Sequence, residues 1–89
     1  MNTEHIFRWA ECRISGAMCL GTRAMHEFGT HVAEARLGGE WVVFDPFDLD
    51  NPAPVARGRA PSQAEAAREV ATVARGLGLT VDPFAGGGR

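Results

Sequence analysis

The stretch THVAEARLGGEWVVFDP, residues 30–46, decides the fold that this sequence predicts. It consists of two runs rich in strand-forming residues, separated by a Gly-Gly dipeptide at positions 38–39. This pattern is typical of a β-hairpin with a two-residue turn. A turn of that length would place Arg36 directly opposite Trp41.

The same hairpin predicts which side chains face the core, because side chains alternate between the two faces of a sheet. The core face is expected to carry Ala33, Ala35, Leu37, Val42 and Phe44. The other face is expected to be mixed and able to meet solvent, with Val32, Glu34, Arg36, Trp41, Val43 and Asp45. On that mixed face, Arg36 and Trp41 would form an exposed cation–π pair.

A single amphipathic helix is predicted from about Gln63 to Arg75. Ser62 and Glu65 form an S-x-x-E capping box, in which the serine hydroxyl accepts a hydrogen bond from the amide of Glu65. Gly76 supplies a stop signal directly after the helix. Apolar, mostly small residues recur at helical spacing and form the expected buried stripe, which consists of Ala67, Val70, Ala71, Ala74 and Leu77.

Two further strands are predicted on either side of the hairpin in sequence. Residues 5–14, HIFRWAECRI, are rich in strand-forming side chains, although the pattern does not settle the register of residues 5–30. Residues 55–60 are expected to form a short edge strand, with Arg57 and Arg59 on its outer side. The sequence therefore predicts an α+β fold, a small antiparallel β-meander of three or four strands packed against one C-terminal helix.

This fold is expected to occupy one domain, residues 1–85, followed by a flexible Gly-rich tail at residues 86–89. The chain of 89 residues has a formal net charge of −2, and all nine of its basic residues are arginine. That charge gives no long-range attraction for nucleic acid or an anionic membrane, so neither is an expected partner. There is no signal-peptide pattern and no apolar run of about 20 residues, and the two cysteines make no disulfide framework. A cytoplasmic location is expected.

Cys12, Cys19, His26 and His31 have the ligand chemistry of a structural zinc site, and a small zinc-binding domain is one alternative function. Their spacing, C-x6-C-x6-H-x4-H, lacks the cysteine pair two to four residues apart that such sites use. A hairpin turning at residues 15–16 would place Cys12 opposite Cys19, where the thiols could share a metal or form a disulfide. The favoured expectation is that the protein holds no metal and no other cofactor.

No pattern of catalytic residues stands out in the sequence. In HEFGTH, residues 26–31, the two histidines are five positions apart, whereas the zinc-protease motif needs them four apart on a helix. Asp45, Asp48, Asp50 and Asn51 lack the glycine and the final glutamate of an EF-hand loop. Neither cysteine is flanked by the signature of a nucleophile. We therefore expect that the protein is not an enzyme.

The predicted function is a small non-enzymatic protein-interaction module, an inhibitor or adaptor of the anti-CRISPR type encoded by a phage or other mobile element. Its sheet face would bind another protein, or a second copy of the chain in a homodimer. Because Trp and Arg are enriched among interface hot spots, the expected partner-binding residues are Phe7, Trp9, Arg36 and Trp41. The other alternative function is nucleic-acid binding through Arg8, Arg13, Arg57 and Arg59, against which the net charge counts.

Overall fold

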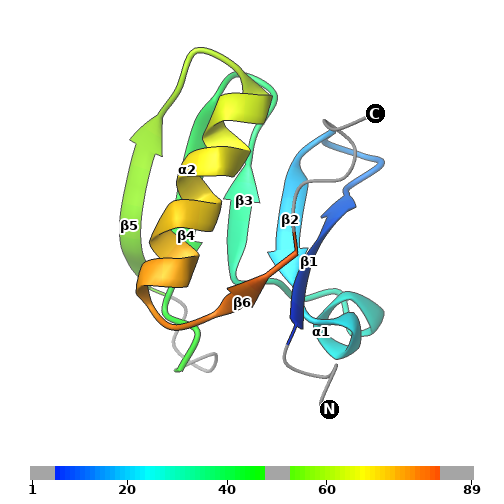
Figure 1. The fold of residues 1–89 in the computed structure, drawn as a ribbon. Helices are drawn as coiled ribbons and strands as arrows, with labels where there is room; N and C mark the ends of the chain where they lie inside the picture. The colour runs from blue at the N-terminus through cyan, green and yellow to red at the C-terminus, as the bar shows by residue number, and fades with distance from the viewer. Residues whose placement is uncertain (1–5, 48–52, 83–89) are drawn as a thin grey trace.

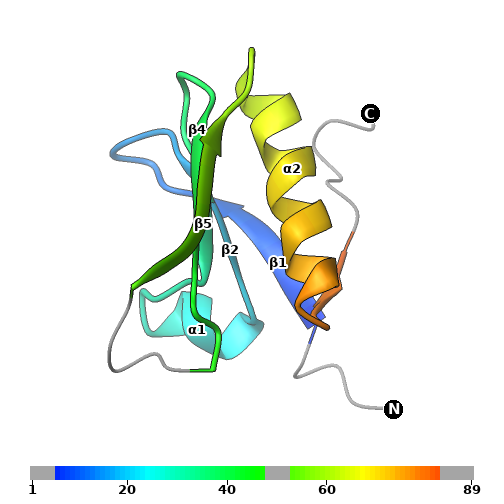
Figure 2. The same cartoon turned by 90° about the vertical axis from the view of Figure 1, so that its left-hand side faces the viewer.

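The computed structural model of this protein describes residues 6–47 and 53–82. The elements follow in the order β1 (Ile6–Glu11), β2 (Met18–Gly21), α1 (Arg23–Glu27), β3 (Ala33–Ala35), β4 (Glu40–Phe44), β5 (Pro54–Arg59), α2 (Gln63–Gly76) and β6 (Thr80–Val81). The strands form one six-stranded sheet in the order β5-β4-β3-β2-β1-β6, with α2 on one face (Figures 1 and 2).

The α+β class predicted from the sequence is confirmed, but the sheet differs from a three- or four-stranded antiparallel meander. Neighbouring strands from β5 to β1 are antiparallel. The sheet is nevertheless mixed, because β6 pairs in parallel with β1. After β5, the chain crosses the sheet as α2 and returns at the opposite edge, beside β1 (Figure 1).

The capped helix α2 forms as its sequence predicts. The Ser62 side chain accepts a hydrogen bond from the amide of Glu65 at 3.2 Å, and the helix extends to Gly76, one residue beyond the predicted end. Its buried side chains are small, which lets the helix approach the sheet closely, and they are Ala66, Ala67, Val70, Ala71 and Ala74. Leu77 of the predicted stripe is the C-cap residue and is only partly buried.

The predicted register of the central hairpin was wrong by one residue. Trp41 lies opposite Ala35 rather than Arg36. The loop contains three residues instead of two, because the amide of Arg36 donates to the carbonyl of Glu40 at 2.8 Å and the amide of Gly39 donates to the carbonyl of Arg36. Gly39 has a positive φ of 92°, and a Cβ at this position would collide with the Ala60 carbonyl oxygen.

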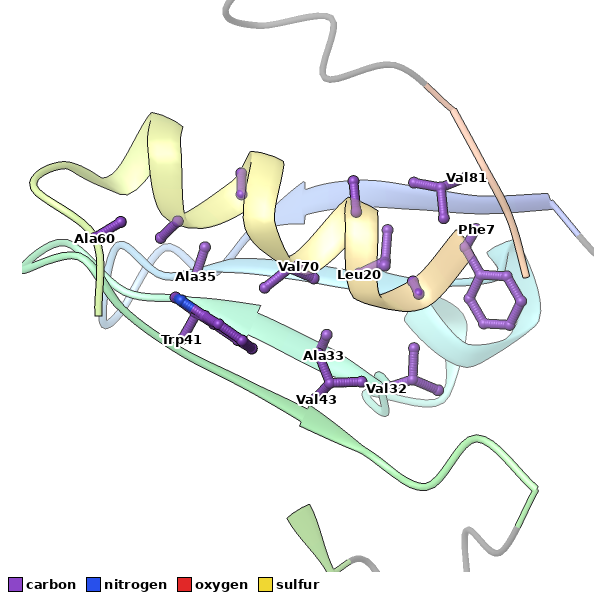
Figure 3. Close-up of a cluster of buried hydrophobic side chains, with 14 residues drawn as sticks. Phe7, Leu20, Val32, Ala33, Ala35, Trp41, Val43, Ala60, Val70 and Val81 are labelled. Carbon is purple, nitrogen blue, oxygen red and sulfur yellow. The ribbon is translucent and has the colours of Figure 1, made fainter. Parts of the chain in front are cut away.

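A shift of one residue moves every side chain of a strand to the other face. Trp41 and Val43 therefore point towards α2 and belong to the core, whereas Val42 and Phe44 share the opposite face with Glu34. Leu37, predicted in the core, lies in the loop and is 66% exposed. The core cluster in Figure 3 consists of Phe7, Leu20, Val32, Ala33, Ala35, Trp41, Val43, Ala60, Ala66, Ala67, Val70, Ala71, Ala74 and Val81.

The front of the chain forms a second hairpin, whose register the sequence analysis left open. Ala10 lies opposite Cys19, and the amide of Cys12 donates to the carbonyl of Ala17 at 2.8 Å. Cys12 is therefore offset from Cys19 by two residues rather than opposite it, because the turn occupies residues 13–16. The short helix α1, which the sequence analysis did not predict, follows this hairpin with Thr22 as its N-cap.

Three of the predictions concern residues outside the described ranges. These residues are the tail at 86–89, the group Asp48, Asp50 and Asn51, and the first residue of the predicted strand at 5–14. None of the helices within residues 6–47 and 53–82 has the length and apolar character needed to cross a bilayer.

Candidate protein-binding face

The face of the sheet opposite α2 is called the outer face; Figure 2 shows that α2 lies on the other side of the sheet. The strand registers align one row of side chains across five strands, because directly opposed residues in antiparallel strands share a face. From β5 to β1 this row is Arg57, Val42, Glu34, Cys19 and Ala10. The row places a cation at the β5 end of the outer face and a carboxylate at its centre.

A shallow hollow of about 250 Å³ lies on the outer face over β4 and β5. Its lining combines apolar and charged residues: Val42, Phe44, Trp41, Pro54 and Gly58 with Arg36, Arg57 and Glu40. Val42 is buried although it points away from α2, whereas Phe44 is partly exposed. An apolar floor beside planar cations is a surface that can bury a partner's apolar side chain and pair with its carboxylates.

Two of the three arginines near this hollow, Arg36 and Arg59, are already paired within the chain. Arg36 Nε lies 3.2 Å from Glu34 Oε1, and Arg59 Nη2 lies 2.6 Å from Glu40 Oε2. The hydrogen bond and the charge of Arg59 lower the pKa of the Glu40 carboxyl from its ordinary value. Arg57 is exposed and forms no ion pair with a described residue. A partner's carboxylate can therefore pair with Arg57 without breaking an internal ion pair.

Only part of the predicted partner-binding set lies on a surface. Trp41 and Phe7 are 9% and 8% exposed, and both belong to the core between α2 and the sheet. Trp9 is partly buried and packs against the same core. Arg36 alone of the four lies on the outer face, so the predicted Arg36–Trp41 pair does not form.

Val42 and Phe44 were predicted in the core but lie on the outer face. No local signal corrects that error, since the sequence Leu37-Gly38-Gly39 is compatible with loops of two or three residues. A signal at longer range was present in Gly58. It lies opposite Trp41, and a Cβ at Gly58 would come within 2.6 Å of the indole ring.

A second hollow, of about 280 Å³, gathers the cysteines and histidines of the predicted zinc alternative. It is lined by Cys12 and Cys19 together with His26 and His31. The His31 ring Nε2 lies 2.7 Å from Glu34 Oε2, and the His26 ring Nε2 lies 2.9 Å from the carbonyl oxygen of Arg8.

The chemistry of this hollow is that of two dissimilar thiols. Burial raises the pKa of the Cys19 thiol to about 11, with a further contribution from the Glu34 carboxylate, so this thiol stays protonated at neutral pH. Hydrogen bonds from Ser15 lower the pKa of Cys12. Within residues 6–47 and 53–82, no three Cys, His, Asp or Glu side chains are grouped so that they could hold a metal ion. The expected absence of a metal stays a prediction.

The arginines of the nucleic-acid alternative do not form one patch. Arg57 and Arg59 lie on β5, whereas Arg8 lies on β1 and Arg13 in the turn after it. Three strands separate β5 from β1, which corresponds to about 19 Å along the sheet. Arg8 also forms an ion pair with Asp82 at 3.2 Å. The dispersed and partly neutralised cations make a poor phosphate-binding surface.

No family model, curated protein or solved structure matches this chain.

Proposed function

We propose that this domain is a non-enzymatic protein-interaction module, an inhibitor or adaptor that binds an acidic surface of a partner protein through its outer sheet face. The observation that supports this function is the hollow formed by Val42 and Phe44, with Arg36 and Arg57 beside it. It lies on the face that α2 leaves uncovered, and its arginine groups fit a partner that carries carboxylates.

The energetic contributions of the two arginines to binding should differ. Arg57 has no ion pair with a described residue, so its full charge is available to a partner. Arg36 shares its charge with Glu34 at 3.2 Å and would have to divide its hydrogen bonds between Glu34 and the partner. We therefore assign the larger contribution to Arg57, and to Val42 and Phe44 the exclusion of water around that pair.

Nucleic-acid binding is the less favoured function, because its four arginines are dispersed over opposite parts of the sheet. An origin in a phage or other mobile element, and an action of the anti-CRISPR type, stay predictions that no observation on this chain tests.

The test of this function is a differential capture. Wild-type protein, Arg57→Glu and Arg13→Glu are immobilised and exposed to lysate of the source cells. Arg13→Glu is the matched control, because it makes the same charge change at an exposed turn remote from β5. A true partner is a protein retained by wild type and Arg13→Glu, and lost with Arg57→Glu.

The captured partner is then purified and titrated at several salt concentrations. For an interface of this kind, Arg57→Glu should weaken binding about tenfold or more, while salt changes the wild-type affinity only modestly. Retention of nucleic acid, with an affinity that falls by orders of magnitude between low and physiological salt, would contradict the proposal. Identical retention by all three proteins would contradict it as well.

A further inference from the structure

The backbone hydrogen bonds define which N–H and C=O groups of β5 face β4 and which point away from the sheet. The amide of Ala60 donates to the carbonyl of Gly39 at 2.8 Å, in line with the register that pairs Gly58 with Trp41. Backbone groups of successive strand residues point alternately to the two sides. Gly58, like Ala60, therefore faces β4, while Arg57 and Arg59 direct their N–H and C=O groups away from the sheet.

β5 is the first strand in the sheet order, and no described strand pairs with its free edge. An edge strand with unpaired N–H and C=O groups is a template for another extended chain. Two features limit the length of that template. Pro54 begins the strand and has no amide hydrogen, and the ladder with β4 is irregular between Val43 and Phe44. The regular part of the open edge therefore runs along Arg57 to Arg59.

We propose that β5 receives an extended acidic segment of the partner as an added strand; this inference rests on the proposed function and names its binding mode. Arg57 and Arg59 lie two residues apart, so their side chains share the outer face. An added strand with an acidic residue at every second position would place its carboxylates beside these two arginine side chains. The recognised chemistry is therefore an extended segment with acidic residues at positions i and i+2. Arg57 would pair with the first of them, and Arg59 would share its charge between Glu40 and the second.

A second copy of this chain is a poor occupant of the same edge. Antiparallel pairing of two β5 strands centred on Arg57 would set Arg57 opposite its own copy. Pairing centred on Gly58 would set Arg57 opposite Arg59. Like charges directly opposite each other in a sheet are destabilising. The charges of the edge therefore favour an acidic segment from another protein.

The probe is a fluorescein-labelled ten-residue peptide of alternating Thr and Glu, acetylated and amidated at its ends. Fluorescence anisotropy should show saturable binding to wild type and to Arg13→Glu. The affinity of Arg57→Glu for the peptide should be lower by about tenfold or more. A peptide of alternating Thr and Lys is the charge control and should not bind.

Backbone methylation of the peptide tests the strand pairing itself. Methyl groups on the amides of every Glu, or of every Thr, block opposite sides of an extended chain. One of these two peptides should lose binding completely, and the other should keep it. Nuclear magnetic resonance should show that the amides of Arg57 and Arg59 exchange with solvent quickly in the free protein and slowly with the peptide bound, while the amide of Gly58 is protected in both states.

Three results would overturn the added strand: equal effects of the two methylation patterns, no binding of the acidic peptide, or a dimer in solution that already protects the Arg57 and Arg59 amides. The proposed function fails separately, by the loss of Arg57-dependent partner capture. Capture that depends on Arg57, combined with no peptide binding, would leave the outer face as the binding site and remove only the strand mode.

Discussion

The two faces of the sheet are built from the same strands but are held by different interactions. On the inner face, alternate residues such as Ala33, Trp41 and Val43 pack beneath the small side chains of α2. On the outer face, the intervening residues form ion pairs, including the one between Glu34 and Arg36. Burial of apolar surface depends on close packing, whereas exposed ion pairs contribute little to folding.

Stability therefore depends on the inner face, and binding is expected on the outer face. Substitutions on the inner face should unfold the domain, because the core cluster packs between the sheet and α2. Substitutions on the outer face should leave the fold intact and change what the surface can bind. Four pairs of variants test that separation. Three of them combine a change at the core with a change at the surface, and the fourth compares two carboxylates outside the core.

Val70→Asp should have the largest effect. Val70 is fully buried at the centre of the α2 stripe, so the variant would bury an unpaired carboxylate. The expected loss is several kcal/mol, comparable with the whole stability of a small domain. Thr72→Asp, on the exposed side of α2, is the control and should melt close to wild type. Equal melting curves of Val70→Asp and wild type would show that α2 does not pack through this residue.

Trp41→Ala should follow, with a loss of about 3–5 kcal/mol for removing a large aromatic side chain from the core. Arg36→Ala, one strand away on the outer face, should lose at most about 1 kcal/mol. Urea unfolding of both variants measures the difference. A stable Trp41→Ala protein that fails only to bind a partner would restore the register in which Trp41 is exposed.

Gly58→Ala tests the contact that accompanies the observed register. The new methyl group would lie 2.6 Å from the Trp41 ring, closer than van der Waals contact. Displacing the indole should destabilise the domain by about 1–3 kcal/mol. Gly76→Ala adds the same methyl group where nothing lies within 4 Å, and should be neutral or stabilise α2 by up to about 1 kcal/mol. Thermal melts that rank the two variants in reverse order would contradict the placement of Trp41.

Glu34→Gln should have the smallest effect, and this effect should depend on pH. Burial raises the pKa of Glu34, but the hydrogen bonds and charges of His31 and Arg36 outweigh it, so the pKa is lower than its ordinary value. A lowered native pKa stabilises the fold above the unfolded pKa, near 4.5, and this contribution is lost as pH falls through the native value.

The advantage of wild type over Glu34→Gln should therefore be below about 1 kcal/mol at neutral pH and should shrink towards pH 3. Urea unfolding at pH 7, 5 and 3 measures it. Glu69→Gln, at an exposed position of α2, controls for the loss of one carboxylate. An advantage that grows on acidification would mean that the native fold does not favour the charged form of Glu34.

Most features of the fold that depend on neighbouring residues were predicted correctly, and those that depend on distant residues were not. The helix was predicted almost to its last residue, since the Ser62 cap and the spacing of its apolar residues lie within α2 and its flank. Helix α1 was missed because five residues are too few to show a period. The candidate site was predicted only in part. Arg36 and Arg57 are on the outer face, but Val42 and Phe44 were placed on the wrong side of the sheet.

Local sequence patterns were enough to predict the elements whose partners are neighbours in the chain: the capped helix, the presence of the central hairpin and the short strand that carries Arg57. Tertiary structure decided the rest. Two contacts select one register from two that differ by a single residue. Gly39 leaves room for the Ala60 carbonyl, and Gly58 leaves room for the Trp41 ring. The parallel pairing of β6 with β1 joins strands from opposite ends of the chain. Such contacts form only when distant segments meet, so no local pattern encodes them.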